Sequence, residues 1–237
     1  MNVVQVEFTT RCNHHCIMCN RGTEIYDMTE ETATNICEKI PELEHIHIAG
    51  SGEPGMHPHL YEIAKVFRDH GITSTLVTNG SISTIPWDMF TEVLLSLHDT
   101  NPVRYNRITG GNIEDVIPNI KHVDIVYNVI TSINGPFMDT IVQDEYKYGA
   151  RIVVNVPIKG WFITGKFVDT SEIEYDSGIS LPKSAKGASK IFISARGNVV
   201  PWCSVLDPNK YLCGNINTDT IDEIVSNLLK CKFKQMQ

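Results

Sequence analysis

The sequence lacks any stretch that would carry the chain into or across a membrane. It contains no run of about 18 apolar residues. Residues 1–7 lack the basic start, the long apolar stretch and the small-residue cleavage site of a secretory signal. Internal repeats and low-complexity blocks are also missing, apart from an alternation of strand and helix patterns. We therefore expect a cytoplasmic protein that contacts no membrane.

Basic residues are too few to make a surface for a polyanion. Lys and Arg number 20 against 28 Asp and Glu, which gives a formal charge of −8, and no stripe of basic residues offsets this balance. We expect no nucleic-acid partner. Hydrophobic residues make up 42% and charged residues 20% of the 237 residues, values that exclude disordered, collagen-like and coiled-coil chains. The length fits one folded domain with at most a small appendage.

The seven cysteines do not fit a disulfide framework. Their number is odd and the chain has no secretion signal, so a metal or cluster site is favoured over disulfides. They fall into two groups and one isolated residue, and the two groups indicate two separate roles. The isolated cysteine lies on the apolar stripe of an expected helix, so a buried core thiol is its better interpretation. The first group is Cys12, Cys16 and Cys19, the isolated residue is Cys37, and the second group is Cys203, Cys213 and Cys231.

Strand-like and helix-like patterns alternate through most of the chain. Such an alternation predicts βα units with a parallel sheet, which right-handed crossovers curl into a partial barrel. We therefore predict an α/β fold: a partial (βα)6 TIM-type barrel of parallel strands with a small C-terminal hairpin-plus-helix extension. The expected strands are 3–8, 45–49, 72–77, 93–97, 123–130 and 152–157, and the expected helices are 29–40, one from about 60 that stops at 71, 113–120 and 137–148.

The C-terminal part follows a different pattern. Strand-like segments at 191–194 and 199–202 flank Arg196-Gly197-Asn198, which has the residues of a hairpin turn. An amphipathic helix follows, with a stripe that is ready to pack on another element. Its apolar residues are Ile221, Ile224, Val225, Leu228 and Leu229. These patterns divide the chain into a core at 1–157, a connector at 158–189 and an extension at 190–237.

Three cysteines directly after the first strand form a compact loop, Cys12-Asn13-His14-His15-Cys16-Ile17-Met18-Cys19. Three thiolates can hold a [4Fe–4S] cluster and leave one iron open for a small molecule. Zinc is the alternative, because Cys16-x-x-Cys19 is a common zinc pair and His14 or His15 can add a nitrogen. A structural zinc site usually takes a second distant pair rather than a third thiol four residues upstream, which favours the cluster.

This loop resembles the Cys-x-x-x-Cys-x-x-Cys signature of the radical S-adenosylmethionine (radical SAM) enzymes. The resemblance implies that Cys12, Cys16 and Cys19 ligate the cluster and that SAM binds the open iron. In that family the residue before the third cysteine packs on the adenine and is usually aromatic. Here it is Met18, a polarisable side chain that can take the same place.

A second segment, Gly50-Ser51-Gly52-Glu53-Pro54, follows the second expected strand and is similar to the Gly-Gly-Glu-Pro motif of the same family, with Ser51 in place of one glycine. In the family this motif reads the methionine amino group. The resemblance implies that Glu53 and the neighbouring backbone carbonyls accept hydrogen bonds from SAM. Taken alone, the segment is more typical of a tight turn, and the cysteine loop that precedes it favours the SAM motif.

Weaker signals lie at the ends of later strands, where a parallel barrel gathers its catalytic residues. Asn79 follows the third expected strand. Ser96 matches the family position that contacts the ribose or the methionine carboxylate. Asn155 on the sixth strand lies near the backbone that reads adenine. Each of these residues is also common as a polar residue at a strand end.

The end of the chain is similar to the SPASM or twitch extension of some radical SAM enzymes, in which Gly-x-Val-x-Pro-Cys and Gly-Asn-Ile precede a short helix. Trp202 is inserted before Cys203, and no Cys-x-x-Cys pairs follow, which excludes a full extension with two clusters. The resemblance implies one auxiliary iron–sulfur cluster on Cys203, Cys213 and Cys231. The alternative is that these three are ordinary small hydrophobes, because such extensions can lose the cluster.

We therefore expect a radical SAM enzyme that forms a 5′-deoxyadenosyl radical and abstracts a hydrogen atom from a small-molecule or peptide substrate. An external one-electron donor of the flavodoxin or ferredoxin type would supply the electron. We prefer an oxidation, because a twitch-sized extension suits one electron sink, over a peptide cross-link or epimerisation. With the first strand starting at Val3, a peptide-modifying role would need a separate leader-binding partner. The rival from another class is a non-catalytic iron–sulfur or zinc sensor.

Overall fold

Six parallel strands form the main sheet, in the same order along the sheet as along the chain. The computed structural model describes residues 2–19, 21–129, 131–155, 191–201 and 211–233, together with two short strands in the intervening segment. The predicted α/β class and parallel partial barrel are confirmed, and the described sheet is open rather than closed. The strands are β1 (Val3–Val6), β2 (His45–Ile48), β3 (Thr73–Thr78), β4 (Glu92–Ser96), β5 (Ile125–Val129) and β6 (Arg151–Asn155).

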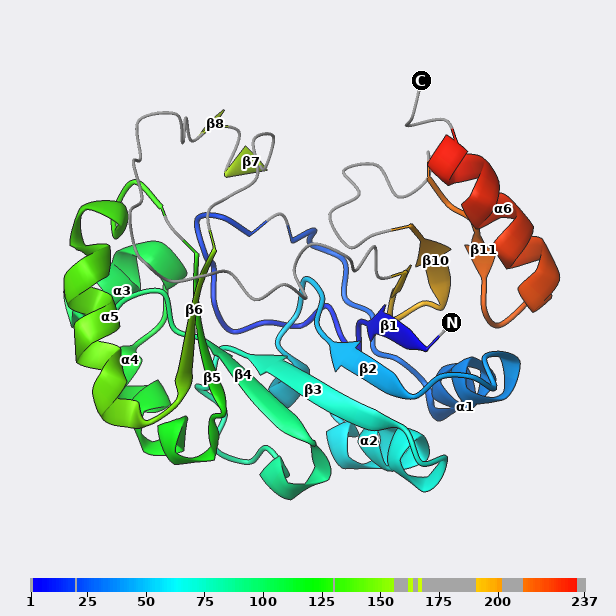
Figure 1. Ribbon diagram of the computed structural model, residues 1–237, viewed down its shortest axis with the longest axis horizontal. Coiled ribbons are helices and arrows are strands. Elements are labelled where there is room, and N and C mark those ends of the chain that lie inside the picture. Colours follow the sequence, from blue (N-terminus) through cyan, green and yellow to red (C-terminus); the bar gives the residue numbers. More distant parts are fainter. Residues whose placement is uncertain are drawn as a thin grey trace.

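The helices cover one side of this sheet. Figure 1 shows α1 and α2 beneath β2 and β3, and α3 to α5 beside β4 to β6. The α-helices are α1 (Glu30–Lys39), α2 (Leu60–Asp69), α3 (Pro102–Thr109), α4 (Ile113–Val116), α5 (Met138–Glu145) and α6 (Ile221–Phe233). Short 3₁₀ turns are η1 (Pro54–Met56), η2 (Trp87–Met89), η3 (Ile117–His122), η4 (Gly135–Phe137) and η5 (Tyr146–Tyr148). No helix of the described residues is long and apolar enough to cross a membrane.

The alternation of side chains along the strands separates the core from the open face. On β2, Ile46 and Ile48 are fully buried among the residues that also include the apolar faces of α1 and α2. His45 and His47 occupy the other face and are half-buried. Cys37 lies in the same apolar core with 6% of its surface exposed, which confirms its assignment as a buried thiol.

The C-terminal hairpin is continuous with the main sheet. Its strands β9 (Phe192–Ile193) and β10 (Asn198–Val200) pair antiparallel, β11 (Gly214–Asn215) follows, and β9 adds to β1 in parallel. This confirms the predicted hairpin, whereas residues 156–190 lie outside the described residues apart from β7 (Phe162–Ile163) and β8 (Lys166–Phe167). The division of the chain into core, connector and extension stays a prediction.

The last helix packs with a narrower face than its sequence indicates. Ile224 and Leu228 are buried in the same core as α1, whereas Val225 and Leu229 are 37% and 54% exposed. Lys39 of α1 adds a polar link, because its Nζ atom donates to the carbonyls of Ile216 and Asp219. The extension is therefore held against the first βα unit rather than against the last one.

Two of the expected helices are interrupted, and one helix was missed. The pattern at 113–120 is a single α-turn followed by 3₁₀ turns, and the pattern at 137–148 is α5 with a 3₁₀ turn at each end. Helix α3 was not predicted, although its ends carry ordinary signals. Asn101 caps it, Pro102 occupies its first turn and Gly110 ends it in the left-handed conformation.

Candidate cofactor-binding site

The cysteine loop between β1 and α1 is closed at its base by hydrogen bonds. The Thr10 N–H donates to the carbonyl of Tyr26 at 2.9 Å, and the Met28 N–H donates to the carbonyl of Phe8 at 2.8 Å. Asp27 links the two sides, since its carboxylate accepts from the Thr9 hydroxyl at 2.6 Å and pairs with Arg11 at 2.9 Å. Arg11 and Thr9 hold the pKa of Asp27 below its usual value against the effect of its burial.

The far side of the loop rests on the end of α3. The last carbonyls of a helix have no partner within the helix. Here the carbonyls of Ile108 and Thr109 accept from the N–H groups of Ile17 and His15, both at 2.8 Å. Gly111 allows the close approach, because a Cβ atom there would lie 2.2 Å from Nε2 of His14. The missed helix is therefore the support of the cysteine loop.

The three cysteines of the loop are free thiols that differ in solvent exposure. Cys12 and Cys16 are half-buried and Cys19 is exposed. Burial, together with the negative charge that Cys19 and Cys12 would carry as thiolates, raises the pKa of Cys16 to about 12, and burial raises the pKa of Cys12. The thiols are thus near enough to influence one another electrostatically, as residues that share one inorganic cofactor must be.

The donor set fits an iron–sulfur cluster. Within the described ranges, no three His, Cys, Asp or Glu side chains are close enough to hold a single metal ion. A [4Fe–4S] cluster makes a weaker demand, because each thiolate binds a different iron and the thiols stand apart. Two further hydrogen bonds hold the backbone of the cysteine loop. Arg21 donates to the Cys12 carbonyl at 2.8 Å, and the Cys19 N–H donates to the Cys16 carbonyl at 3.0 Å.

The loop after β2 packs directly against the cysteine loop. The Glu53 N–H donates to the carbonyl of Arg11 at 2.6 Å. At Gly52 the two backbones come so close that a Cβ atom would lie 2.0 Å from the carbonyl oxygen of Thr9. This glycine is required by the close approach, since even a methyl group has no room.

The Glu53 carboxylate is largely used by the protein itself. It accepts from the Gly55 N–H at 3.0 Å, the Thr78 hydroxyl at 2.6 Å and the Asn79 N–H at 2.6 Å, and only 2% of the residue is exposed. Burial raises the pKa of Glu53 although these donors oppose the shift. Its clear structural role is to tie the loop after β2 to the end of β3.

Asn79 extends this connection to the cysteine loop. Its side-chain N–H donates to Asn13 at 2.9 Å, and Asn13 in turn donates to the hydroxyl of Ser81 at 2.8 Å. The Asn79 side-chain oxygen accepts from the N–H and the hydroxyl of Ser81. The ends of β1, β2 and β3 are therefore joined in one polar network.

Glu7 holds the serine that replaces the expected glycine. It is buried at the end of β1, and one carboxylate oxygen accepts from both the N–H and the hydroxyl of Ser51, at 2.8 and 2.7 Å. The other oxygen accepts from the N–H of Ala195 in the C-terminal hairpin at 3.3 Å. A side chain at Gly50 would collide with Glu7. The sequence interpretation missed Glu7, whose only signal was a charged residue in an apolar strand.

The remaining sequence-predicted residues are placed less fully. Ser96 is half-buried at the end of β4, opposite Tyr127 of β5, and Met18 is half-buried in the cysteine loop. Cys213 is fully buried, and its thiol donates to the Tyr211 carbonyl at 3.3 Å. Asn155 ends β6 and Cys231 lies in α6, but their side chains are outside the described residues, as is all of Cys203.

Comparison with known proteins identifies the class. Residues 6–147 match the family model of the radical SAM superfamily, and this match covers more than half of the chain. The chain belongs to that superfamily. It is an enzyme family that uses a [4Fe–4S] cluster and S-adenosylmethionine.

Individual relatives are more distant. The chain is 28% identical over 206 residues to the tungsten-containing aldehyde ferredoxin oxidoreductase cofactor-modifying protein of Pyrococcus furiosus, covering 76% of this chain and 57% of that protein. It is 35% identical over 74 residues to the tRNA 4-demethylwyosine synthase of Methanocaldococcus jannaschii, covering 31% of this chain and 24% of that protein. Both curated relatives are therefore matched over less than two thirds of their length.

Among solved structures, SuiB of Streptococcus suis bound to S-adenosylmethionine is similar in fold, with a TM-score of 0.72 and 13% sequence identity. The match covers 94% of this chain and 65% of SuiB. SuiB bound to its precursor peptide SuiA gives a TM-score of 0.71, with 14% identity over 92% of this chain and 63% of that one. At such identities the likeness shows the fold, and it includes the partial barrel predicted from the sequence.

Proposed function

We propose that this chain holds a [4Fe–4S] cluster on Cys12, Cys16 and Cys19 and cleaves S-adenosylmethionine reductively to methionine and a 5′-deoxyadenosyl radical. The radical then takes a hydrogen atom from the substrate. When bound, the cluster would supply the electron and one iron without a cysteine ligand, where SAM can bind. An external one-electron donor of the flavodoxin or ferredoxin type would reduce the cluster again.

The observation that carries this proposal is the contact between the two loops. The cysteine loop and the loop after β2 are joined by the hydrogen bond from Glu53 to Arg11, at an approach that only Gly52 permits. The resemblance assigns the cluster to the first loop and the methionine group of SAM to the second. A fixed contact between them supports binding of one molecule that touches both, because preorganised groups need no ordering when the ligand arrives.

The residues would divide the binding of SAM among them. We assign the methionine amino group to the backbone carbonyls of the Gly50-Ser51-Gly52 turn, with Glu53 and Asn79 holding that turn in place. We assign Ser96 to the ribose or the carboxylate of SAM. Met18 and Asn155 remain our candidates for the adenine. Exclusion of water by the surrounding loops would keep the radical from side reactions.

A direct test is anaerobic reconstitution with iron and sulfide, followed by dithionite and SAM. We expect 5′-deoxyadenosine and methionine from the wild-type chain and neither product from the Cys12→Ala, Cys16→Ala, Cys19→Ala triple variant. The matched control is Cys37→Ala, which removes a buried core thiol remote in sequence from the loop. A reconstituted protein that holds zinc without acid-labile sulfide would contradict the proposal. A reconstituted chain that does not bind SAM would favour the rival, a non-catalytic iron–sulfur or zinc sensor.

For the substrate we propose an oxidation of a small molecule or of a short peptide segment. A peptide modification is the second candidate. It is favoured by the fold match to SuiB, which was solved in complex with the precursor peptide SuiA and is similar over 92% of this chain. The curated relative from Pyrococcus furiosus is described as modifying a cofactor, which is a small molecule. Mass spectrometry of what co-purifies with the chain separates the two, since a bound leader-type peptide would overturn the oxidation.

We also propose an auxiliary iron–sulfur cluster on Cys203, Cys213 and Cys231. The burial of Cys213 beside the C-terminal hairpin supports a protected site there, although its thiol has a carbonyl partner in this structure. The Cys12, Cys16 and Cys19 triple alanine variant tests this second cluster. About four irons and four sulfides per chain remain if the extension holds a cubane of its own, and none remain if these three thiols are structural.

A further inference from the structure

Two buried polar atoms beside the cysteine loop have no hydrogen-bond partner among the described residues. They are the hydroxyl of Tyr105 in α3 and Nδ1 of His14 in the loop itself. The two rings pack edge to face, with their centroids 6.1 Å apart. Folded proteins pair nearly all of their buried polar groups, so an unpaired hydroxyl next to a candidate cofactor site needs an explanation.

Tyr105 is closed off from water. None of its surface is exposed, and its ring belongs to an apolar cluster to which β4, α4 and β5 contribute. The hydroxyl of Thr109, one turn further along the helix, does not serve it. Thr109 donates to the Tyr105 carbonyl at 2.9 Å and accepts from the Gly111 N–H at 3.0 Å. The phenol therefore keeps a donor that is unused and removed from solvent, an unfavourable arrangement unless another group accepts from it.

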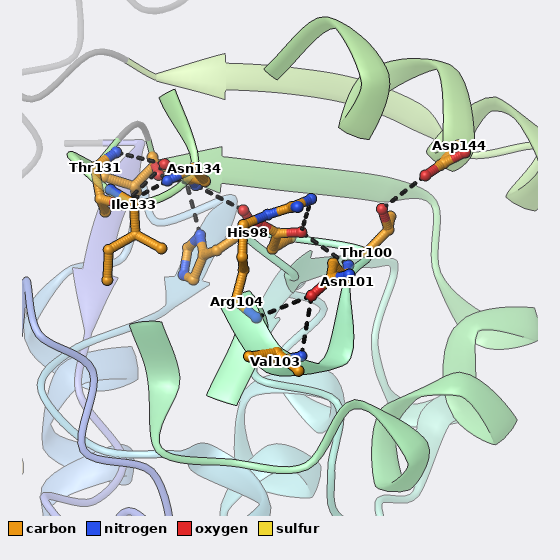
Figure 2. Close-up of polar contacts among 11 residues, drawn as sticks. His98, Thr100, Asn101, Val103, Arg104, Thr131, Ile133, Asn134 and Asp144 are labelled. Carbon is orange, nitrogen blue, oxygen red and sulfur yellow. Dashed lines mark hydrogen bonds and ion pairs between the residues drawn. The ribbon is translucent and has the colours of Figure 1, made fainter. Parts of the chain in front are cut away.

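Helix α3 holds this hydroxyl in a fixed place relative to the cysteine loop. Figure 2 shows its first turn, where the Asn101 side chain accepts from the N–H groups of Val103 and Arg104, both at 3.1 Å. Arg104 also pairs with the fully buried Asp99 at 2.7 Å. At the other end, the last carbonyls of the helix accept from the N–H groups of the residues directly before and after Cys16, both at 2.8 Å. Tyr105 lies between these two anchors.

Among the charged groups around the phenol, Cys16 has the strongest influence. Burial raises the pKa of Tyr105, and a thiolate at Cys16 would raise it further, ahead of Glu53 and Asp115. Such an interaction weakens with distance. The Glu53 carboxylate already accepts from three donors of its own. Together with the ring contact to His14, this places the Tyr105 side chain beside the part of the loop that carries Cys16.

We propose that the Tyr105 hydroxyl donates a hydrogen bond to a negatively charged sulfur of the iron–sulfur cluster, the Cys16 thiolate or a sulfide next to it. The inference rests on the proposed function and goes beyond it, since it assigns a residue that sets the reduction potential of the cluster. A neutral thiol is a weak acceptor, whereas the thiolate and sulfide of a bound cluster are charged ones. The hydroxyl can donate to them from its preformed position.

Such a hydrogen bond favours the reduced cluster, which carries one more negative charge. Tyr105→Phe removes the hydroxyl and keeps the ring in its apolar cluster. We expect the equilibrium constant for reduction to fall about tenfold, which lowers the potential of a one-electron couple by about 59 mV. The matched control is Tyr146→Phe, the same change at a residue that is 66% exposed, and it should keep the wild-type potential.

The measurement is an anaerobic redox titration of the reconstituted chains. It follows the EPR signal that is absent from the Cys12, Cys16 and Cys19 triple alanine variant. Pulsed EPR of the reduced cluster in D₂O adds a readout that a change in polarity alone would not move. The hydroxyl proton exchanges with solvent, so the cluster in Tyr105→Phe should couple to one exchangeable deuteron fewer than in the wild type.

Iron and sulfide content and melting temperature are measured on the same samples. If Tyr105→Phe takes up too little cluster for a titration, Tyr105→Met, whose flexible side chain also fills an apolar site, carries the test. An unchanged potential or an unchanged deuteron coupling in a loaded variant overturns the inference and leaves a buried water as the partner of the hydroxyl. A wild-type chain that takes up no iron–sulfur cluster contradicts the proposed function instead, so the two failures are distinguishable.

Discussion

The two halves of the sheet differ in how completely their buried carboxylates are hydrogen-bonded. At the ends of β1 to β3, carboxylates such as Glu7 and Glu53 have protein donors on both oxygens. At β5 and α5, Asn128 Oδ1 and Glu145 Oε1 are buried and have no partner among the described residues. In the first half these carboxylates hold loops together, and the unpartnered buried atom there is Nδ1 of His14 rather than a carboxylate oxygen. The second half depends on a proton or on a ligand to complete its hydrogen bonds.

The largest expected effect breaks the framework of the first half. In Gly52→Ala the new methyl group would lie 2.0 Å from the carbonyl oxygen of Thr9, so the two loops must separate. We expect a loss of about 3 kcal/mol in the free energy of unfolding and little or no bound iron after reconstitution. Gly22→Ala is the matched control, because nothing lies within 4 Å of its Cβ position. Normal iron content in Gly52→Ala would show that the loops do not need this contact.

The second prediction concerns the buried pair Asn128 and Glu145 of the second half and the pH dependence of its contribution to stability. Burial raises the pKa of Glu145 to about 7, above its value in an unfolded chain. The folded state therefore holds the proton more tightly, and the stabilising contribution of this group is present at low pH and is lost as the pH rises to about 7. The Asn128 N–H already donates to Glu145 Oε2 at 2.7 Å, so a protonated Glu145 can complete the pair by donating to Asn128 Oδ1.

Glu145→Gln carries a permanent N–H donor in place of that proton. We expect this variant to be more stable than the wild type by about 2 kcal/mol at pH 8 and to differ little from it at pH 5. The difference at pH 8 follows from the raised pKa of Glu145, because each pKa unit corresponds to about 1.4 kcal/mol. Urea unfolding at both pH values measures this difference. Asp139→Asn, an exposed change on the same helix, should show no such pH dependence. An equal difference at pH 5 and pH 8 would mean that Glu145 does not titrate in this range.

The third expected effect is smaller. It concerns Glu7, which links the loop after β2 to the C-terminal hairpin. In Glu7→Gln one of the N–H groups of Ser51 and Ala195 loses its acceptor, because the amide nitrogen cannot accept. We expect a cost of about 1 to 2 kcal/mol in the free energy of unfolding and weaker binding of SAM. Glu38→Gln, an exposed residue of α1, serves as the control. Wild-type values for Glu7→Gln would remove Glu7 from the account of the site.

The sequence predicted the parts of the molecule that repeat a simple period. Buried alternation located β1 to β6 to within a few residues, whereas the shared cofactor that the spacing of Cys12, Cys16 and Cys19 indicates stays a prediction. Helix α3 was missed because Tyr105 and Ile108 are the only apolar residues among its buried ones, although Asn101, Pro102 and Gly110 mark its ends. A weak apolar pattern can be overlooked when capping residues are not weighed beside it.

The site was harder to predict than the fold because its contacts join distant segments. Glu7 and Ser51 are 44 positions apart, and Glu7 and Ala195 are 188 apart. Periodicity carries no information on such pairs. The protein partners of Glu53 were missed for the same reason, since Thr78 and Asn79 belong to the end of the neighbouring strand, and its contact with SAM stays a prediction.

The central claim is that the cysteine loop leaves one iron of a cluster free for SAM. Mössbauer spectroscopy of the chain reconstituted with ⁵⁷Fe, recorded with and without SAM, tests it most directly. The account predicts that SAM changes the signal of a single iron of the cluster held by Cys12, Cys16 and Cys19, and that this change disappears in their triple alanine variant. Spectra that are identical with and without SAM, in a chain that has taken up its iron and sulfide, would contradict the account.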